Sequence, residues 1–137
     1  MALFYTDSSA LVKLVRDESE SPTLRAFLAD ADLVSCEICL TEVPRAIRRA
    51  ASEEPELPLE LLLQRAGELF EALGLLALER DVLLAAGALD EPALRSLDAI
   101  HLVAAIALSP LDGFVSYDER QSAAARLAGL RTFAPTG

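Results

Sequence analysis

The segment ALFYT (residues 2–6) follows Met1 and is an apolar run that stops directly at Asp7. A short, unbroken apolar run of this kind predicts a buried β-strand. Similar short runs return four more times, at residues 32–35, 75–78, 114–117 and 130–133. Segments with helical periodicity lie between them. This alternation predicts an α/β fold with a central parallel sheet of about five strands and helices on both faces.

Capping and breaking residues set the expected helix boundaries. Ser8 or Ser9 can cap the first helix, Pro44 predicts a kink in the third, and Gly74 predicts a C-cap for the fourth. Leu62, Ala66, Leu69 and Leu73 form the apolar stripe of that fourth helix. The expected helices are residues 10–15, 22–31, 36–51, 59–73, 81–89, 97–108 and 119–128.

The size and composition predict one domain over residues 1–137. Hydrophobic residues make up 53% of the chain and only two residues are cysteine, which excludes a disordered chain and a disulfide scaffold. No apolar stretch is long enough for a membrane span and no basic segment opens a signal peptide, so we expect a cytoplasmic protein. The mean hydropathy of +0.33 indicates spare apolar surface, which predicts a homodimer.

The charge restricts the possible nucleic-acid partners. The formal net charge is −10, from 12 basic and 22 acidic side chains, which argues against non-specific binding of duplex DNA by a broad basic face. Nucleic-acid chemistry then requires metal ions or a local basic patch. The basic patch that stands out is Arg45, Arg48 and Arg49, which either contact RNA phosphates or form a solvated helix face.

Two acids follow predicted strands directly. Asp7 comes after the first strand and Asp118 after the fourth, at the carboxyl edge where open α/β sheets bind ligands. Each could be a simple helix N-cap. The recurrence of the pattern favours a functional site.

Two further acids lie on helices. Asp98 and His101 are the strongly polar residues of the apolar helix 97–108, so Asp98 either faces a site or complements the helix dipole. Glu42 lies between an apolar and a basic stripe, where a surface ion pair with Arg45 or Arg49 is the simpler interpretation. If the four carboxylates converge, they require cations, and an all-oxygen set predicts Mg²⁺ or Mn²⁺.

Four segments together resemble a known family. DSSALVKL (7–14), TEV (41–43) with its following arginines, LDAIHL (97–102) and VSYD (115–118) are similar, in order and spacing, to the PIN-domain nucleases. The nearest resemblance is to the VapC toxins of bacterial toxin–antitoxin pairs, and it spans essentially the whole chain.

The resemblance implies a PIN-like three-layer fold and Mg²⁺-dependent endoribonuclease activity. It aligns Asp7, Glu42, Asp98 and Asp118 with the family's acidic quartet, in which Asp7 and Asp98 hold the ion, Asp118 completes the metal site, and Glu42 holds a ligand water or a second ion. A metal-activated water would cleave the phosphodiester bond and leave 5′-phosphate and 3′-hydroxyl ends. Ser116, with Ser9, matches a small hydroxyl position beside the acids, and we expect Ser116 to contact substrate.

The family resemblance also implies partners. They are an RNA substrate, a cognate antitoxin protein and a second copy of the chain. Pro44 departs from the family pattern, because an ordinary helix former is expected there, and it could alter the direction of Glu42.

Other motifs carry less chemistry. Cys36 and Cys39 form a C-x-x-C pair that we interpret as buried small hydrophobes, and a structural role for His101 is favoured over a general base. The chain has no dinucleotide fingerprint, no P-loop and no nucleophile elbow. A second functional class stays open: a catalytically weak interaction module whose acidic pocket binds a basic peptide of a partner protein.

Overall fold

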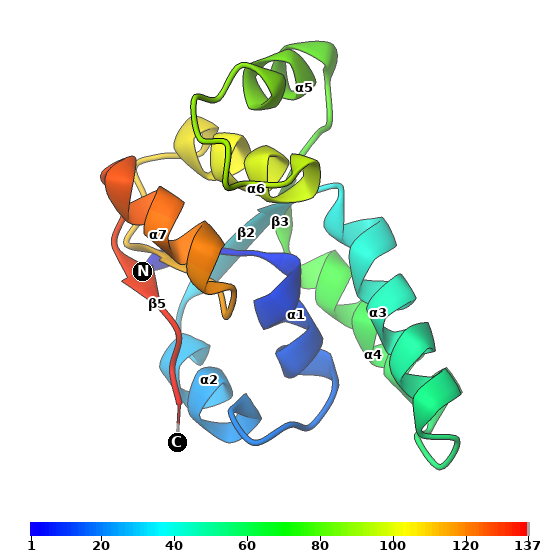
Figure 1. Cartoon of the computed structure of the whole chain (residues 1–137). Coiled ribbons are helices and arrows are strands. Elements are labelled where there is room, and N and C mark those ends of the chain that lie inside the picture. Colours follow the sequence, from blue (N-terminus) through cyan, green and yellow to red (C-terminus); the bar gives the residue numbers. More distant parts are fainter. Residues whose placement is uncertain (137) are drawn as a thin grey trace.

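A computed structural model describes residues 1–136 and shows a five-stranded sheet in which every neighbouring pair is parallel (Figure 1). The strand order is β3-β2-β1-β4-β5. The predicted α/β class and the five strands are confirmed. The strands are β1 (Leu3–Thr6), β2 (Asp32–Cys36), β3 (Gly74–Leu76), β4 (Gly113–Val115) and β5 (Thr132–Phe133).

Seven helices cover the two faces of the sheet. Helices α1, α2, α3 and α4 pack on one face of the sheet, and α6 and α7 pack on the other (Figure 1). Helix α5 packs on the outer side of α6. This is the predicted three-layer arrangement. The helices are α1 (Ser8–Val15), α2 (Ser21–Leu28), α3 (Cys39–Glu53), α4 (Leu59–Ala72), α5 (Arg80–Gly87), α6 (Ser96–Ala107) and α7 (Glu119–Leu127).

Successive side chains of β1 and β4 point to opposite faces of the sheet and so belong to different parts of the core. Tyr5 and Phe114 are register partners, stack at 5.3 Å and pack toward α6 and α7. The neighbouring residues Phe4 and Val115 belong to the cluster on the α1 and α2 side. Such double-sided burial explains why these strands appear in the sequence as unbroken apolar runs.

The strand order creates a switch point between β1 and β4. From β1 the chain first adds β2 and β3 on one side, and then returns to add β4 and β5 on the other. Ligands of open α/β sheets bind at the carboxyl ends of the strands that flank such a reversal. Asp7 and Asp118 follow those two strands.

Several predicted boundaries are wrong, for local reasons. Asp7, rather than Ser8 or Ser9, caps α1, because its carboxylate accepts the backbone N–H of Ala10. Cys36 belongs to β2 because it is in register with Leu76, so α3 begins later than expected. Gly74 is not a C-cap: it starts β3, and α4 ends at an extended residue.

Pro44 lies inside α3, which runs continuously from Cys39 to Glu53. Within the described part of the chain, no helix combines the length and the apolar character needed to cross a membrane.

Candidate active site

Three of the four predicted acids line one pocket at the switch point. Glu42 reaches it from α3, Asp98 from the first turn of α6, and Asp118 from the N-terminus of α7. The pocket encloses about 590 Å³, and its other lining residues are Arg95, Ser96, Leu97 and Arg120. Parts of the chain that are far apart in sequence therefore supply one acidic pocket.

Asp7 lies at the same edge but is buried, with only 2% of its surface exposed. Its Oδ1 accepts hydrogen bonds from Ser9 Oγ at 2.6 Å and from the Ala10 backbone N–H, and its Oδ2 accepts one from Ser116 Oγ. Burial raises the pKa of Asp7, and these hydrogen bonds only partly offset the effect. The N-cap interpretation is thus confirmed, but the cap carries a costly buried charge.

Ser116 links this buried acid to the pocket. Its hydroxyl donates to Asp7 and accepts the backbone N–H of Asp118 at 3.0 Å, and its side chain is fully buried. That Ser116 contacts substrate stays a prediction. Its hydroxyl positions Asp7 relative to the start of α7.

Asp118 and Asp98 share the pocket as like charges. The Oδ1 of Asp118 caps α7 by accepting the backbone N–H groups of Arg120 and Gln121. Burial and then repulsion from Asp118 raise the pKa of Asp98. Gln121 Nε2 donates to the backbone carbonyl of Asp98 at 2.8 Å and so joins α7 to α6. The two carboxylates are held together despite their repulsion.

Glu42 is held by a buried polar network rather than by an arginine. Its Oε1 accepts hydrogen bonds from Ser8 Oγ and from His101 Nε2, both at 2.7 Å. His101 Nδ1 lies 2.7 Å from Tyr5 Oη, and the imidazole is almost fully buried. The helix that contains Pro44 therefore directs Glu42 into the site.

The same network sets the charge of the histidine. Burial would lower the pKa of His101, but hydrogen bonding to Cys36 and Glu42 outweighs burial and raises the pKa to about 10. Burial would raise the pKa of Glu42, but the hydrogen bonds from His101 and Ser8 and the positive charge of His101 together lower it. Burial and the bonds to Glu42 and Tyr5 hold the imidazole in place, which supports the structural interpretation of His101.

The three arginines of the predicted basic patch do not share one surface. Arg45 and Arg49 line a groove of about 450 Å³ between α1 and α3, together with Glu42. Arg48 is exposed and is not among the residues that line this groove or the acidic pocket. The reason is helical geometry: at 100° per residue, Arg45 and Arg49 return close to the direction of Glu42, whereas Arg48 points well away from it.

Two arginines of the pocket were missed. Arg95 precedes Asp98 by three residues and Arg120 follows Asp118 by two, and both line the acidic pocket. Their position beside the candidate acids was the available signal. An isolated arginine next to a helix start otherwise looks like any solvated side chain.

The two cysteines are free and fully buried, which confirms their interpretation as packed small side chains. Among residues 1–136, no group of three His, Cys, Asp or Glu side chains is close enough to form a ready-made metal site. The carboxylates of the acidic pocket line one space, but they are not close enough together to coordinate a single ion as they stand.

Comparison with known proteins places this geometry in a family. The family model of the PIN domain matches residues 4–127. Ribonuclease VapC35 of Mycobacterium tuberculosis is 37% identical over 140 residues, covering 97% of this chain and 97% of the relative.

Two solved structures share the fold. The crystal structure of Mycobacterium tuberculosis VapC20, a Sarcin-Ricin loop cleaving toxin, aligns with a TM-score of 0.70 at 16% identity, covering 88% of this chain and 94% of that one. A toxin–antitoxin complex from Klebsiella pneumoniae aligns with a TM-score of 0.58 at 21% identity, covering 90% and 91%. Since the family model matches most of the chain and the ribonuclease relative spans nearly all of it, the chain belongs to the PIN-domain family.

Proposed function

We propose that this protein is a Mg²⁺-dependent endoribonuclease and the toxin of a type II, VapBC-like toxin–antitoxin pair. The observation that carries the proposal is the pocket at the switch point, which Glu42, Asp98 and Asp118 line and to which Ser116 connects the buried Asp7 through Asp118. The similarity to Ribonuclease VapC35 over nearly the full length supports the same conclusion.

The donor set of the pocket fits a hard divalent cation. Its acids offer only carboxylate oxygens, and the raised pKa of Asp98, caused by burial and the nearby Asp118, indicates negative charge that is not fully compensated. Asp7, Asp98 and Asp118 would hold Mg²⁺, or Mn²⁺ in its place. When bound, the ion would neutralise the carboxylates, polarise the scissile phosphate and lower the pKa of a water.

The protein's own groups would orient the reaction. Glu42, held by Ser8 and His101, would direct the attacking water for in-line displacement, which leaves 5′-phosphate and 3′-hydroxyl ends. Ser116 would keep Asp7 aligned with the N-terminus of α7. His101, whose pKa is raised by its hydrogen bonds to Cys36 and Glu42, would hold Glu42 ionised rather than exchange protons with it.

The proposed biological setting follows from the family. We propose that the protein acts in the cytoplasm as a homodimer and is neutralised by a cognate antitoxin, as the similarity to the Klebsiella pneumoniae toxin–antitoxin complex suggests. A basic segment of the antitoxin could enter the acidic pocket. RNA phosphates could follow the groove that Arg45 and Arg49 line.

The direct test is incubation of the purified protein with total RNA, with and without Mg²⁺. We expect cleavage that requires the ion and that Asp98→Asn abolishes. Millimolar Mg²⁺ should also raise the melting temperature of the wild type, because only the folded state gathers the carboxylates, and Asp98→Asn should lose most of that gain. Cleavage or melting that is the same in Mg²⁺ and in chelator would contradict the metal site.

A catalytically weak interaction module is the second candidate. It is favoured by the absence, among residues 1–136, of three potential ligands already within coordinating reach. This candidate predicts no RNA cleavage in Mg²⁺ or Mn²⁺, together with tight binding of a lysine- and arginine-rich peptide that Asp98→Asn weakens.

A further inference from the structure

Arg95 and Arg120 both line the acidic pocket. Arg95 is the N-cap residue of α6, and Arg120 lies in the first turn of α7, so the two guanidinium groups come from different helices. Both side chains are exposed. Burial therefore does not explain their presence beside three carboxylates.

Neither arginine is committed to a carboxylate. Among the described residues, the arginines in salt bridges within 4.0 Å are Arg16, Arg25 and Arg126. Arg95 and Arg120 share a pocket with Glu42, Asp98 and Asp118 and yet form no such pair. Their donors remain available to a ligand.

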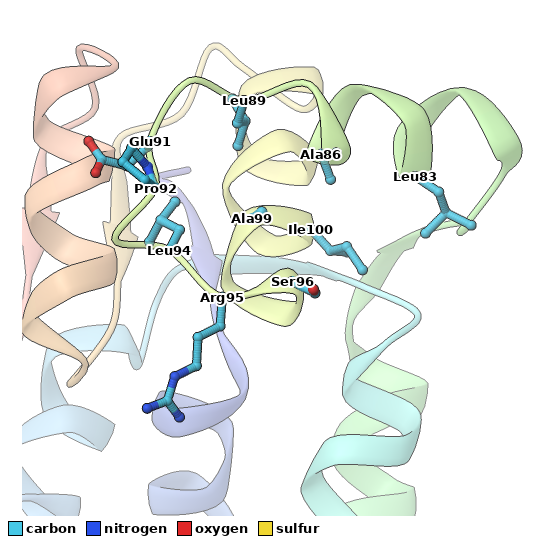
Figure 2. A pocket seen from close by; sticks show the side chains of 11 residues that line it. Leu83, Ala86, Leu89, Glu91, Pro92, Leu94, Arg95, Ser96, Ala99 and Ile100 are labelled. Atoms are coloured by element: carbon cyan, nitrogen blue, oxygen red, sulfur yellow. The ribbon is translucent and has the colours of Figure 1, made fainter.

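The start of α6 adds further free donors. No side chain caps this helix, and Ser96 and Leu97 of its first turn line the pocket beside Arg95. The first backbone N–H groups of a helix have no partner within the helix and favour anions. Figure 2 shows the neighbouring pocket between α5 and α6, with the Arg95 side chain extending away from Leu83, Ala86 and Leu89. The guanidinium thus points away from the α5 side of that pocket, which shares Arg95 and Ser96 with the acidic one.

Charge decides the class of ligand. A purely basic peptide would pair with the carboxylates but would leave the two uncommitted guanidinium groups without a partner. A phosphodiester needs cations beside the acids, all the more in a chain of net charge −10. The planar guanidinium fork binds two phosphate oxygens at once.

We propose that Arg95 and Arg120, which come from different helices, together bind the RNA phosphate at the acidic pocket, with the N-terminus of α6 contributing backbone donors. This inference rests on the proposed ribonuclease function and names the cations that hold its substrate. Arg45 and Arg49 would then contact only flanking phosphates along the groove.

The test measures binding separately from cleavage. A labelled single-stranded RNA oligonucleotide is titrated by fluorescence anisotropy with protein in the Asp98→Asn background, in chelator, over a series of salt concentrations. Arg95→Ala and Arg120→Ala should each weaken binding about tenfold and reduce the salt slope by about 0.7, the value for one phosphate contact on a single strand. Arg95→Lys and Arg120→Lys should recover the slope but only part of the affinity, because lysine lacks the fork.

Arg65→Ala is the matched control, since Arg65 is exposed on α4 and lines neither the pocket nor the groove. It should leave affinity and slope unchanged. If both pocket variants bind RNA like Arg65→Ala while the wild type cleaves RNA in Mg²⁺, the inference is overturned and the proposed function stands. If the wild type neither binds nor cleaves RNA, both fail. Unchanged RNA binding with tighter binding of an oligolysine peptide would favour the interaction module.

Discussion

Asp7 caps a helix, which needs no charge, and is also a buried carboxylate at the candidate site, where the charge matters. As an N-cap it needs only one oxygen, which asparagine would also supply. As a buried carboxylate it needs Ser9 and Ser116 as well, and burial still raises its pKa. The charge therefore contributes less to folding than a neutral cap would, which indicates a role outside folding.

Replacement of Asp7 by asparagine should separate the two roles. We expect Asp7→Asn to keep or raise the free energy of unfolding in chelator, by up to about 1 kcal/mol, because the cap survives and a buried charge is removed. Mg²⁺-dependent stabilisation and RNA cleavage should both be lost. Thermal melts with and without Mg²⁺ measure the change, with the exposed Asp30→Asn as control. A loss of several kcal/mol in chelator would show that the charge is needed by the fold.

His101 should make stability depend on pH. Its pKa rises from 6.5 to about 10 on folding, so its stabilising contribution is complete below about pH 6.5 and is lost as the pH rises toward 10. His101→Gln keeps a donor for Glu42 but not the charge, and it should cost about 3 kcal/mol at pH 6. The difference from the wild type should shrink steadily by pH 10. Urea unfolding at pH 6, 8 and 10 measures it, and a deficit that is constant with pH would mean that His101 is neutral in the folded protein.

At the scale of elements, helix starts supply the site. Asp7 and Asp118 cap α1 and α7, and Asp98 lies in the first turn of α6. Each helix N-terminus carries partial positive charge, which helps to hold acids together there. The site therefore depends on where the helices begin.

Two glycines should respond in opposite directions to the same substitution. Gly129 closes α7 at φ +91°, with backbone bonds from Gly129 to Arg126 and from Leu130 to Ala125 that form a Schellman ending. Gly129→Ala should cost about 1 kcal/mol, because alanine is strained at positive φ. Gly67 lies exposed inside α4 with no atom within 4 Å of an added Cβ. Gly67→Ala should gain about 0.5–1 kcal/mol.

Chemical unfolding of both variants measures the pair. Neither glycine lies in the acidic pocket, so RNA cleavage at low temperature should stay at the wild-type level. A stabilising Gly129→Ala would contradict the left-handed ending of α7.

At the scale of the whole molecule, apolar surface is left uncovered in this chain. Leu83 and Leu84, adjacent on α5, are 46% and 67% exposed, and α5 lies outermost on its face of the sheet (Figure 1). An exposed apolar pair on an outer helix is a common feature of protein interfaces. We infer that this helix contributes to the proposed homodimer.

Sedimentation should therefore report about twice 14.7 kDa at micromolar concentration. Leu84→Glu should shift the protein toward the monomer by placing a charge in the apolar contact. Leu127→Glu, at the 81% exposed end of α7, is the matched control and should remain dimeric. A mass near 14.7 kDa for the wild type would contradict the dimer, and a dimeric Leu84→Glu would exclude α5 from its interface.

The sequence by itself determined the class of fold, the strands and two of the acids. Buried parallel strands are local apolar runs, and a residue that ends such a run must lie at the sheet edge, so Asp7 and Asp118 could be found without coordinates. Helix starts were less certain, since Cys36 looks equally suited to a strand or a helix until its pairing with Leu76 is known.

Only the tertiary structure decided what these acids meet. His101 and Glu42 are 59 residues apart, and their hydrogen bond exists because the order β3-β2-β1-β4-β5 brings α3 and α6 to one edge of the sheet. Arg95 and Arg120 enter the pocket for the same reason, while Arg48 is turned away by its helical angle. Local patterns encode strands and caps through short-range sterics and burial, whereas contacts between distant segments depend on the packing of the whole chain.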